Sequence, residues 1–272
     1  MESHYIHGTQ AQEQARLARL NELLNRRSLG AMRLRGGERI LDVGSGLGQL
    51  SLAMLEAAGP AATVLGIERE AAQREKAEEL RARSALRERL EFRPGDAMAL
   101  PLREAEWRTF DVVHTRFLLE HVPQPLAVVE QMVRAARPGG RVILEDDDHD
   151  LLRLWPVCPE IDALWKIYES TYVAVGNDPI VGRRLVELLQ RAGASPTRND
   201  WLFFGACTGH PEFGDYVTNL RGVLVGAREA MLRTQQTTAE EIDDALQALE
   251  NWAQRPDAAL WYCSAWAEGV VR

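Results

Sequence analysis

An apolar segment that breaks into alternating glycines constrains this chain more than any other feature. Residues Arg39–Val43 predict a strand, Gly44, Gly46 and Gly48 follow at every second position, and apolar residues at helical spacing come next. Glycine at such a junction lets the backbone turn sharply and lie directly against a ligand, where a Cβ atom would collide with it. The segment therefore predicts a strand-to-helix turn that binds something bulky and polar.

The spacing of the glycines narrows the class of ligand. A dinucleotide-binding turn would need a glycine where this chain has Gln49, and no Gly-Lys-Ser or Gly-Lys-Thr follows that would make a nucleotide-binding P-loop. The strand ends at Asp42, whose carboxylate would repel a phosphate and attract a cationic group. The turn therefore favours a ligand that carries positive charge.

Further motifs follow at the ends of predicted strands. Val64–Glu68 is a short apolar run that ends in a carboxylate 20 residues after Gly48. The other motifs are Gly95-Asp96-Ala97, a buried strand at Phe110–His114, and an Arg-Pro-Gly-Gly turn at 137–140. Each could be ordinary when taken alone, since Gly-Asp is a common turn pair and Glu68 could be a surface carboxylate. The inference depends on their order.

In this order the motifs resemble those of the class I S-adenosylmethionine-dependent methyltransferases, in particular their small-molecule (type 11) group. The resemblance implies S-adenosylmethionine as the cofactor and S-adenosylhomocysteine as its product. It also implies that Glu68 binds the ribose hydroxyls and that Asp96 lies near the adenine amino group. The residues expected to contact the cofactor are Tyr5, His7, Asp42, Gly44, Gly46, Gly48, Glu68, Arg69, Asp96, Ala97, Thr115 and Arg116.

Strand and helix patterns alternate along the chain and predict an α/β fold. Residues 37–148 contain five such alternations, which predicts a parallel sheet covered by helices, with every motif at the carboxyl end of a strand. The resemblance implies a Rossmann-like, doubly wound sheet of seven strands in the order 3-2-1-4-5-7-6. Residues 1–36 would form an N-terminal helical cap, residues 149–194 a lid and a helix, and residues 195–272 strands six and seven with a helical insertion.

Two of these segments have open interpretations. The start of the chain could cap the cofactor through Tyr5 and His7, or it could be a frayed terminus. The helix predicted over Pro159–Val175 is rich in aromatic residues, which could shape an apolar acceptor pocket or simply pack in the core. The last two strands are predicted at Asp200–Ala206 and Ala259–Ala267. The chain between them is far longer than a hairpin needs, so it predicts further cover for the substrate.

The candidates for acceptor chemistry follow strands four and five. The resemblance places His121 near the substrate, although this side chain could merely cap the next turn. Strand five runs into Glu145–Asp150, where repulsion among carboxylates must be offset by solvent, a cation or a metal. This run could be a solvated loop, or it could line the acceptor pocket, with Asp148 or His149 accepting a proton from the nucleophile.

A metal site is the third interpretation of the acidic run. Metal-dependent members of the family also use an acidic ligand after strand four, where this chain has Thr115 and Arg116. No metal is therefore expected, and His149, His121 and Asp148 are the catalytic candidates.

Composition limits the partners. The formal charge is −8, and the basic residues are mixed with acidic ones, whereas nucleic-acid binding usually needs a concentrated positive surface. No apolar run approaches the about 20 residues needed to cross a bilayer, and no secretory leader is recognisable, so a cytoplasmic protein is expected. Three scattered cysteines predict free thiols. A monomer or a homodimer is expected.

The predicted function is methyl transfer to a small-molecule acceptor, a secondary or specialised metabolite, with O-, N- and C-methylation all open. Two alternatives come from other classes. The chain could bind the cofactor as a regulator, or it could use the bound sulfonium as an electrostatic element while it catalyses a cyclisation or rearrangement. Protein methylation stays possible within the family, although the predicted cover argues against so large an acceptor.

Overall fold

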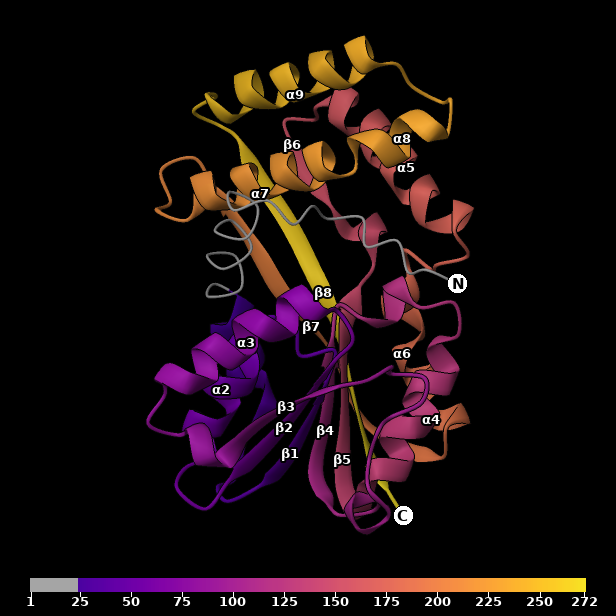
Figure 1. The fold of residues 1–272 in the computed structure, drawn as a ribbon. Helices are drawn as coiled ribbons and strands as arrows, with labels where there is room; N and C mark the ends of the chain where they lie inside the picture. Colours follow the sequence, from indigo (N-terminus) through magenta and orange to yellow (C-terminus); the bar gives the residue numbers. More distant parts are fainter. Residues whose placement is uncertain (1–23) are drawn as a thin grey trace. The chain divides into compact units, whose positions relative to one another are not determined.

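The computed structural model describes residues 24–272, which divide into two units. Each unit combines segments that are far apart in the sequence (Figure 1). The sheet unit consists of Leu24–Asp147, Ile180–Leu202 and Ser264–Arg272. The helical unit contains Asp148–Pro179 and Phe203–Cys263.

The sheet unit has the predicted parallel sheet. Its strands are β1 (Arg39–Val43), β2 (Thr63–Glu68), β3 (Leu90–Pro94), β4 (Phe110–Arg116) and β5 (Ala136–Asp147). Their order is β3-β2-β1-β4-β5, and all four pairings are parallel. The carboxyl ends of these strands therefore lie at one edge, which is where the sequence motifs were expected to meet.

The last two predicted strands are β7 (Ala194–Cys207) and β8 (Ala259–Val271). Residues Ser264–Val270 of β8 pair antiparallel with β5, and β7 pairs with β8. The predicted position of the final strand between the fifth and the penultimate one is therefore confirmed. One strand was not predicted: the three-residue β6 (Arg153–Trp155), which pairs with the start of β8 in the helical unit.

The turn predicted at 137–140 is not a separate turn before strand five. These residues belong to β5, and the register with β4 jumps from Phe110–Ala136 to Val112–Arg141. Gly139 takes a φ of 76°, a value that side chains disfavour. The Pro-Gly-Gly sequence is therefore a bulge that bends the strand rather than starting it.

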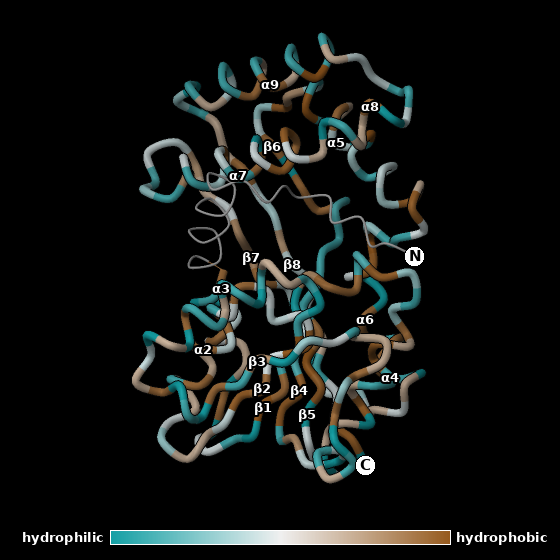
Figure 2. The backbone as a smooth tube through the Cα atoms, in the orientation of Figure 1, coloured by the Kyte–Doolittle hydropathy of each residue, from teal (hydrophilic) through white to brown (hydrophobic). Residues whose placement is uncertain are grey.

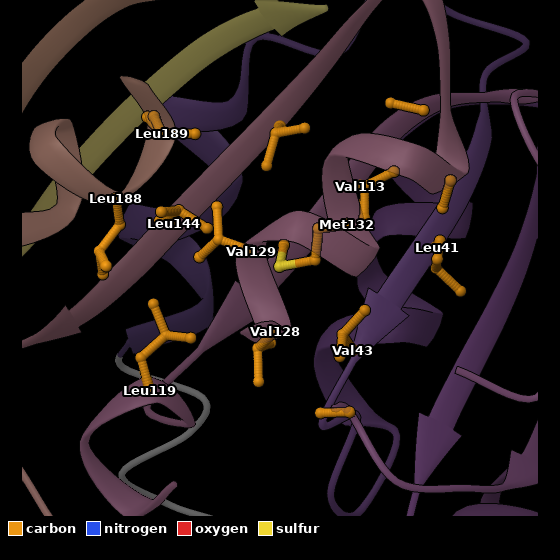
Figure 3. Close-up of a cluster of buried hydrophobic side chains, with 14 of the residues drawn as sticks. Leu41, Val43, Val113, Leu119, Val128, Val129, Met132, Leu144, Leu188 and Leu189 are labelled. Atoms are coloured by element: carbon orange, nitrogen blue, oxygen red, sulfur yellow. The ribbon is translucent and has the colours of Figure 1, made fainter. Parts of the chain in front are cut away.

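The two faces of the sheet differ in chemistry. The helices of the sheet unit are a helix at residues 24–32, α2 (Gln49–Ala57), α3 (Ala71–Arg83), α4 (Pro125–Ala135) and α6 (Leu185–Arg191). Helices α4 and α6 pack on the face that carries Leu41, Val113 and Leu144, and together they form a dry core (Figure 3). The strands themselves are mostly hydrophobic (Figure 2).

Asp42 and His114 point to the face of the sheet opposite this apolar core, because side chains alternate along a strand.

The helical unit contains α5 (Pro159–Ala174), α7 (Phe213–Gly226), α8 (Arg228–Arg233) and α9 (Ala239–Ala253). Pro159 occupies the first turn of α5, and α9 begins with a capping box between Thr238 and Glu241, as such residues predict. Helix α5 packs against α8 and α9, and α7 packs against α9. None of the helices in residues 24–272 combines the length and the apolar character that crossing a bilayer requires. The three cysteines are free thiols, as predicted.

Candidate functional site

The glycine turn joins β1 to α2. Gly44, Gly46 and Gly48 have φ angles of 77°, 54° and 75°, which L-residues with side chains rarely adopt. A Cβ atom added to Gly48 would lie 2.4 Å from Cζ of Phe92, so neither the backbone angle nor the available space permits a side chain there. Helix α2 begins at this turn without a side-chain cap, so its first N–H groups can face a polar ligand.

Glu68 lies at the end of β2, beside the turn, as the sequence predicts. Its Oε2 atom accepts a hydrogen bond from the Gly46 N–H at 2.9 Å, and its Oε1 atom accepts one from the Glu70 N–H at 2.7 Å. The carboxylate has lone pairs left for two further donors, which is what ribose hydroxyls would require. Burial raises the pKa of the Glu68 carboxyl, and the hydrogen bonds from Glu70 and Gly46 oppose that shift.

Asp42 lies beneath the turn rather than at its surface. Its Oδ2 atom accepts a hydrogen bond from Ser51 Oγ at 2.5 Å, and its Oδ1 atom lies 2.9 Å from Nδ1 of His114. Only 2% of the residue is exposed. Any effect of Asp42 on a bound cofactor must therefore come from its charge and from its support of the turn.

Thr115 and Arg116 use their side chains inside the sheet unit. Thr115 Oγ1 donates to the Val43 carbonyl at 2.8 Å, and Arg116 donates to Asn25 Oδ1 at 2.9 Å and to Ser28 Oγ at 3.2 Å. Burial lowers the pKa of the Arg116 guanidinium, and nearby carboxylates oppose that shift. The contacts of these two residues with a cofactor therefore stay predictions.

The residues predicted for the adenine end have different environments. Asp96 Oδ1 accepts a hydrogen bond from the Met98 N–H at 2.8 Å, which closes a tight turn after β3. Ala97 belongs to the buried core, and Arg69 forms an ion pair with Glu70 on the surface. Their contacts with the cofactor stay predictions. The two candidates nearest the start of the chain, Tyr5 and His7, lie outside the described residues.

The acidic run, whose first three residues belong to β5, is not the solvated loop that was one interpretation. Glu145 and Asp146 are fully buried. Asp146 accepts hydrogen bonds from the backbone N–H groups of Leu118, Leu119 and Glu120, at 3.1, 2.8 and 3.4 Å. Backbone donors therefore stabilise the Asp146 side chain, a contribution that the sequence did not predict. Burial and then the Glu120 charge raise the pKa of Asp146 far above its ordinary value.

The three catalytic candidates fall in different units. His121 ends a short 3-10 turn in the sheet unit, and its Nε2 atom lies 3.5 Å from Oε1 of Glu120. Asp148 and His149 belong to the helical unit, where the Asp148 carboxylate accepts a hydrogen bond from the Asp150 N–H at 3.2 Å. The structure therefore does not bring His121 into one unit with the other two.

His149 lies in an aromatic cluster of the helical unit. Its ring centroid is 5.4 Å from that of Trp165, 5.3 Å from that of Tyr168 and 5.1 Å from that of Tyr172, and its Nδ1 atom is 3.4 Å from the Tyr262 hydroxyl. All three aromatic residues come from α5 and are buried. The aromatic stripe thus packs inward around an imidazole, and its role as a lid stays a prediction.

Sequence reasoning missed three residues of this arrangement. Ser51 and His114 are the hydrogen-bond partners of Asp42, and Asp146 holds the loop after β4. The signal for His114 was its polar side chain within an otherwise apolar strand, which was interpreted only as part of a buried strand.

Comparison with known proteins gives the same assignment as the geometry. The methyltransferase-domain family model matches residues 34–193. The chain is 36% identical over 140 residues to the 27-O-demethylrifamycin SV methyltransferase of Amycolatopsis mediterranei, a match that covers 52% of this chain and 50% of the relative. This chain spans about half the length of the curated relatives that it matches.

Two solved structures share the fold. A putative methyltransferase from Bacillus halodurans has a TM-score of 0.57 at 14% identity, and the match covers 89% of this chain and 96% of that protein's chain. The cyclase SpnF has a TM-score of 0.52 at 21% identity, and the match covers 91% of this chain and 82% of the SpnF chain. The ordered motifs, the glycine turn with its neighbouring carboxylate, and a family match over more than half of the chain lead to one assignment. The chain belongs to the class I S-adenosylmethionine-dependent methyltransferases.

Proposed function

We propose that the protein transfers the methyl group of S-adenosylmethionine to a small-molecule acceptor, a specialised metabolite. The observation that supports the cofactor in this proposal is the Gly46–Glu68 hydrogen bond, because it holds the carboxylate that we propose for the ribose beside a turn that only glycine can form. Support for the acceptor class comes from the relative in Amycolatopsis mediterranei, whose name denotes a methyltransferase acting on an O-demethylated rifamycin.

The protein itself forms no covalent bond in this reaction. The bound cofactor supplies a methyl group activated by positive sulfur, and an acceptor attacks it in line. The protein aligns the two partners, excludes water and, for a weakly acidic acceptor, takes up a proton. The predicted residues His121, His149 and Asp148 are the candidates for this base.

His121 is the base that its surroundings support best. Its imidazole keeps 16% exposure, and the adjacent Glu120 carboxylate can fix its orientation. An imidazole oriented by a carboxylate is a common arrangement for general bases. His149 is only 3% exposed and is enclosed by aromatic rings, so we assign it to shaping the acceptor side.

The first experiment is calorimetric titration with S-adenosylmethionine and S-adenosylhomocysteine, followed by an acceptor screen weighted towards hydroxylated metabolites. We expect micromolar binding of both ligands, and a product heavier by one methylene group with release of S-adenosylhomocysteine. Absence of binding would contradict the proposal. His121→Gln should lower turnover with little change in cofactor affinity, and His149→Gln provides the comparison for the second histidine.

The main alternative is a cyclisation or rearrangement assisted by bound cofactor. The likeness to SpnF extends over most of both chains, but at 21% identity it shows a shared fold alone. The acceptor screen separates the two functions. A product isomeric with its substrate, formed without release of S-adenosylhomocysteine, would favour the alternative. Binding of the cofactor without any product would favour a regulator.

Glu68 provides a test of the cofactor site that does not need an acceptor. Glu68→Gln should weaken S-adenosylmethionine binding by about 3- to 10-fold, because charge-assisted hydrogen bonds to the ribose would be lost. Glu79→Gln is the matched control, since the Glu79 side chain pairs with Lys76 on the surface of α3 and should not affect binding. Equal affinity of both variants and the wild type would mean that the ribose does not bind at β2.

A further inference from the structure

A carboxylate–imidazole pair lies beneath the glycine turn. Asp42 on β1 and His114 on β4 are directly opposite each other in the parallel pairing of the two strands. Nδ1 of His114 lies 2.9 Å from Oδ1 of Asp42, and Ser51 Oγ donates to the other carboxylate oxygen. The imidazole is fully buried and Asp42 is 2% exposed. The pair is therefore shielded from water, where hydrogen bonds to a charge are strong.

The hydrogen-bond pattern assigns the tautomer of His114. An ionised carboxylate only accepts, so Nδ1 must carry the hydrogen that it donates to Asp42. Nε2 is then an acceptor, and within residues 24–272 it has no hydrogen-bond partner. A buried acceptor without a partner costs free energy that an apolar side chain at this position would avoid. The contact with Asp42 is thus the favourable interaction that a histidine supplies here.

Arg116 is a cation on the same face of β4 as His114. Its guanidinium attracts Glu145 most strongly and then Asp42 and Asp147, and it donates hydrogen bonds to Asn25 and Ser28. Arg116 therefore supplies a diffuse field around Asp42. In the described part of the chain, the hydrogen bonds that fix the orientation of the Asp42 carboxylate come from Ser51 and His114.

We infer that His114 is a positioning residue that holds the Asp42 charge fixed beneath the turn, and that this charge raises the affinity for the positively charged cofactor. The inference rests on the assignment of S-adenosylmethionine as the ligand of the turn. Without the imidazole, one oxygen of a buried carboxylate would lack a donor. Rotation of the carboxylate towards another donor would relieve this, and it would move the negative charge from its place below the ligand.

Two variants separate the hydrogen bond from packing. His114→Leu keeps a side chain branched at Cγ but has no donor, whereas His114→Asn places an amide N–H where Nδ1 stood. Two ligands test the role of the ligand's charge: S-adenosylmethionine carries the sulfonium and ammonium groups, and 5′-methylthioadenosine has the same nucleoside but lacks the amino-acid chain and both positive charges. Calorimetry of both ligands with all three proteins gives the comparison.

His114→Leu should bind S-adenosylmethionine about 10-fold more weakly, as expected for losing a hydrogen bond to a charged group, and should bind 5′-methylthioadenosine within about 2-fold of the wild type. His114→Asn should recover S-adenosylmethionine binding to within about 3-fold. Once an acceptor is known, the KM for the cofactor should rise in His114→Leu while kcat is unchanged.

Three results would overturn the inference. The first is equal S-adenosylmethionine affinity of His114→Leu and the wild type, and the second is an equal loss for the charged and the neutral ligand. The third needs no variant: nitrogen NMR of the wild type should show His114 protonated at Nδ1, and a hydrogen at Nε2 alone would contradict the pair. Failure of the wild type itself to bind S-adenosylmethionine would instead contradict the cofactor assignment, and this inference would fall with it.

Discussion

Replacement of Gly48 by alanine should destabilise the sheet unit, and the structure separates the cost into two parts. Gly48 has a φ of 75°, a conformation that costs an alanine roughly 1–2 kcal/mol. The added Cβ atom would also lie 2.4 Å from Cζ of Phe92 and 3.0 Å from Cβ of Ala77. Phe92 is 7% exposed and cannot swing into solvent, so this overpacking adds about 1–3 kcal/mol. The total loss is about 2–5 kcal/mol.

Gly59 provides a matched control in the same unit. Its φ is 79°, nearly that of Gly48, but a Cβ atom there would meet nothing within 4 Å. Gly59→Ala should therefore cost only the backbone part, roughly 1–2 kcal/mol. The difference between the two variants isolates the steric contact with Phe92.

Urea unfolding of both variants and the wild type, followed by circular dichroism, measures these costs. Cofactor titration in the absence of urea should show a large loss of affinity for Gly48→Ala and none for Gly59→Ala, because Gly59 lies outside the turn. Equal destabilisation by the two substitutions would refute the steric argument, and would mean that Phe92 can move away at little cost.

Two further predictions concern pH. The Arg93 guanidinium lowers the pKa of Glu106 to about 2, so the stabilisation by this pair is complete above pH 4.5 and disappears as the pH falls through 2. The free energies of unfolding of the wild type and Glu106→Gln should therefore differ by about 1–3 kcal/mol at neutral pH and converge near pH 2, and a constant difference would contradict this. The pH dependence of stability has the opposite sign for Asp146. Because the pKa of Asp146 is raised in the folded protein, its contribution to the free energy of unfolding is present below pH 3.8 and is lost as the pH rises through the pKa of the folded state. The stability of the wild type relative to Asp146→Asn should thus fall as the pH increases from 4, and thermal melts that show no such trend would argue against a raised pKa.

The strands that carry the motifs could be predicted closely because an apolar run followed by glycine or a carboxylate has few alternatives. The observed β1 has the predicted bounds, and Glu68 lies beside Gly46 because the ends of adjacent parallel strands must meet. The short strand β6 could not be predicted, since three residues carry no periodicity and their pairing with β8 decides their conformation.

The parts of the site that sequence reasoning missed depend on contacts between distant segments. No local pattern shows that His114 faces Asp42, because the register of β1 against β4 is a property of the assembled sheet. The burial of Asp146 is a similar case. Its position in an acidic run suggested solvent or a cation, but three backbone N–H groups of the loop after β4 bind it instead.

The pairing of β1 with β4 also has a consequence for folding kinetics. Asp42 and His114 are 72 residues apart in the sequence, and so are Val43 and Thr115. Contacts of such long range form late and slowly, because a large loop must close before they are made. A ligand that needs the ends of both strands would then recognise only chains that are already almost fully folded. S-adenosylmethionine is accordingly expected to slow unfolding in stopped-flow experiments while leaving the refolding rate unchanged.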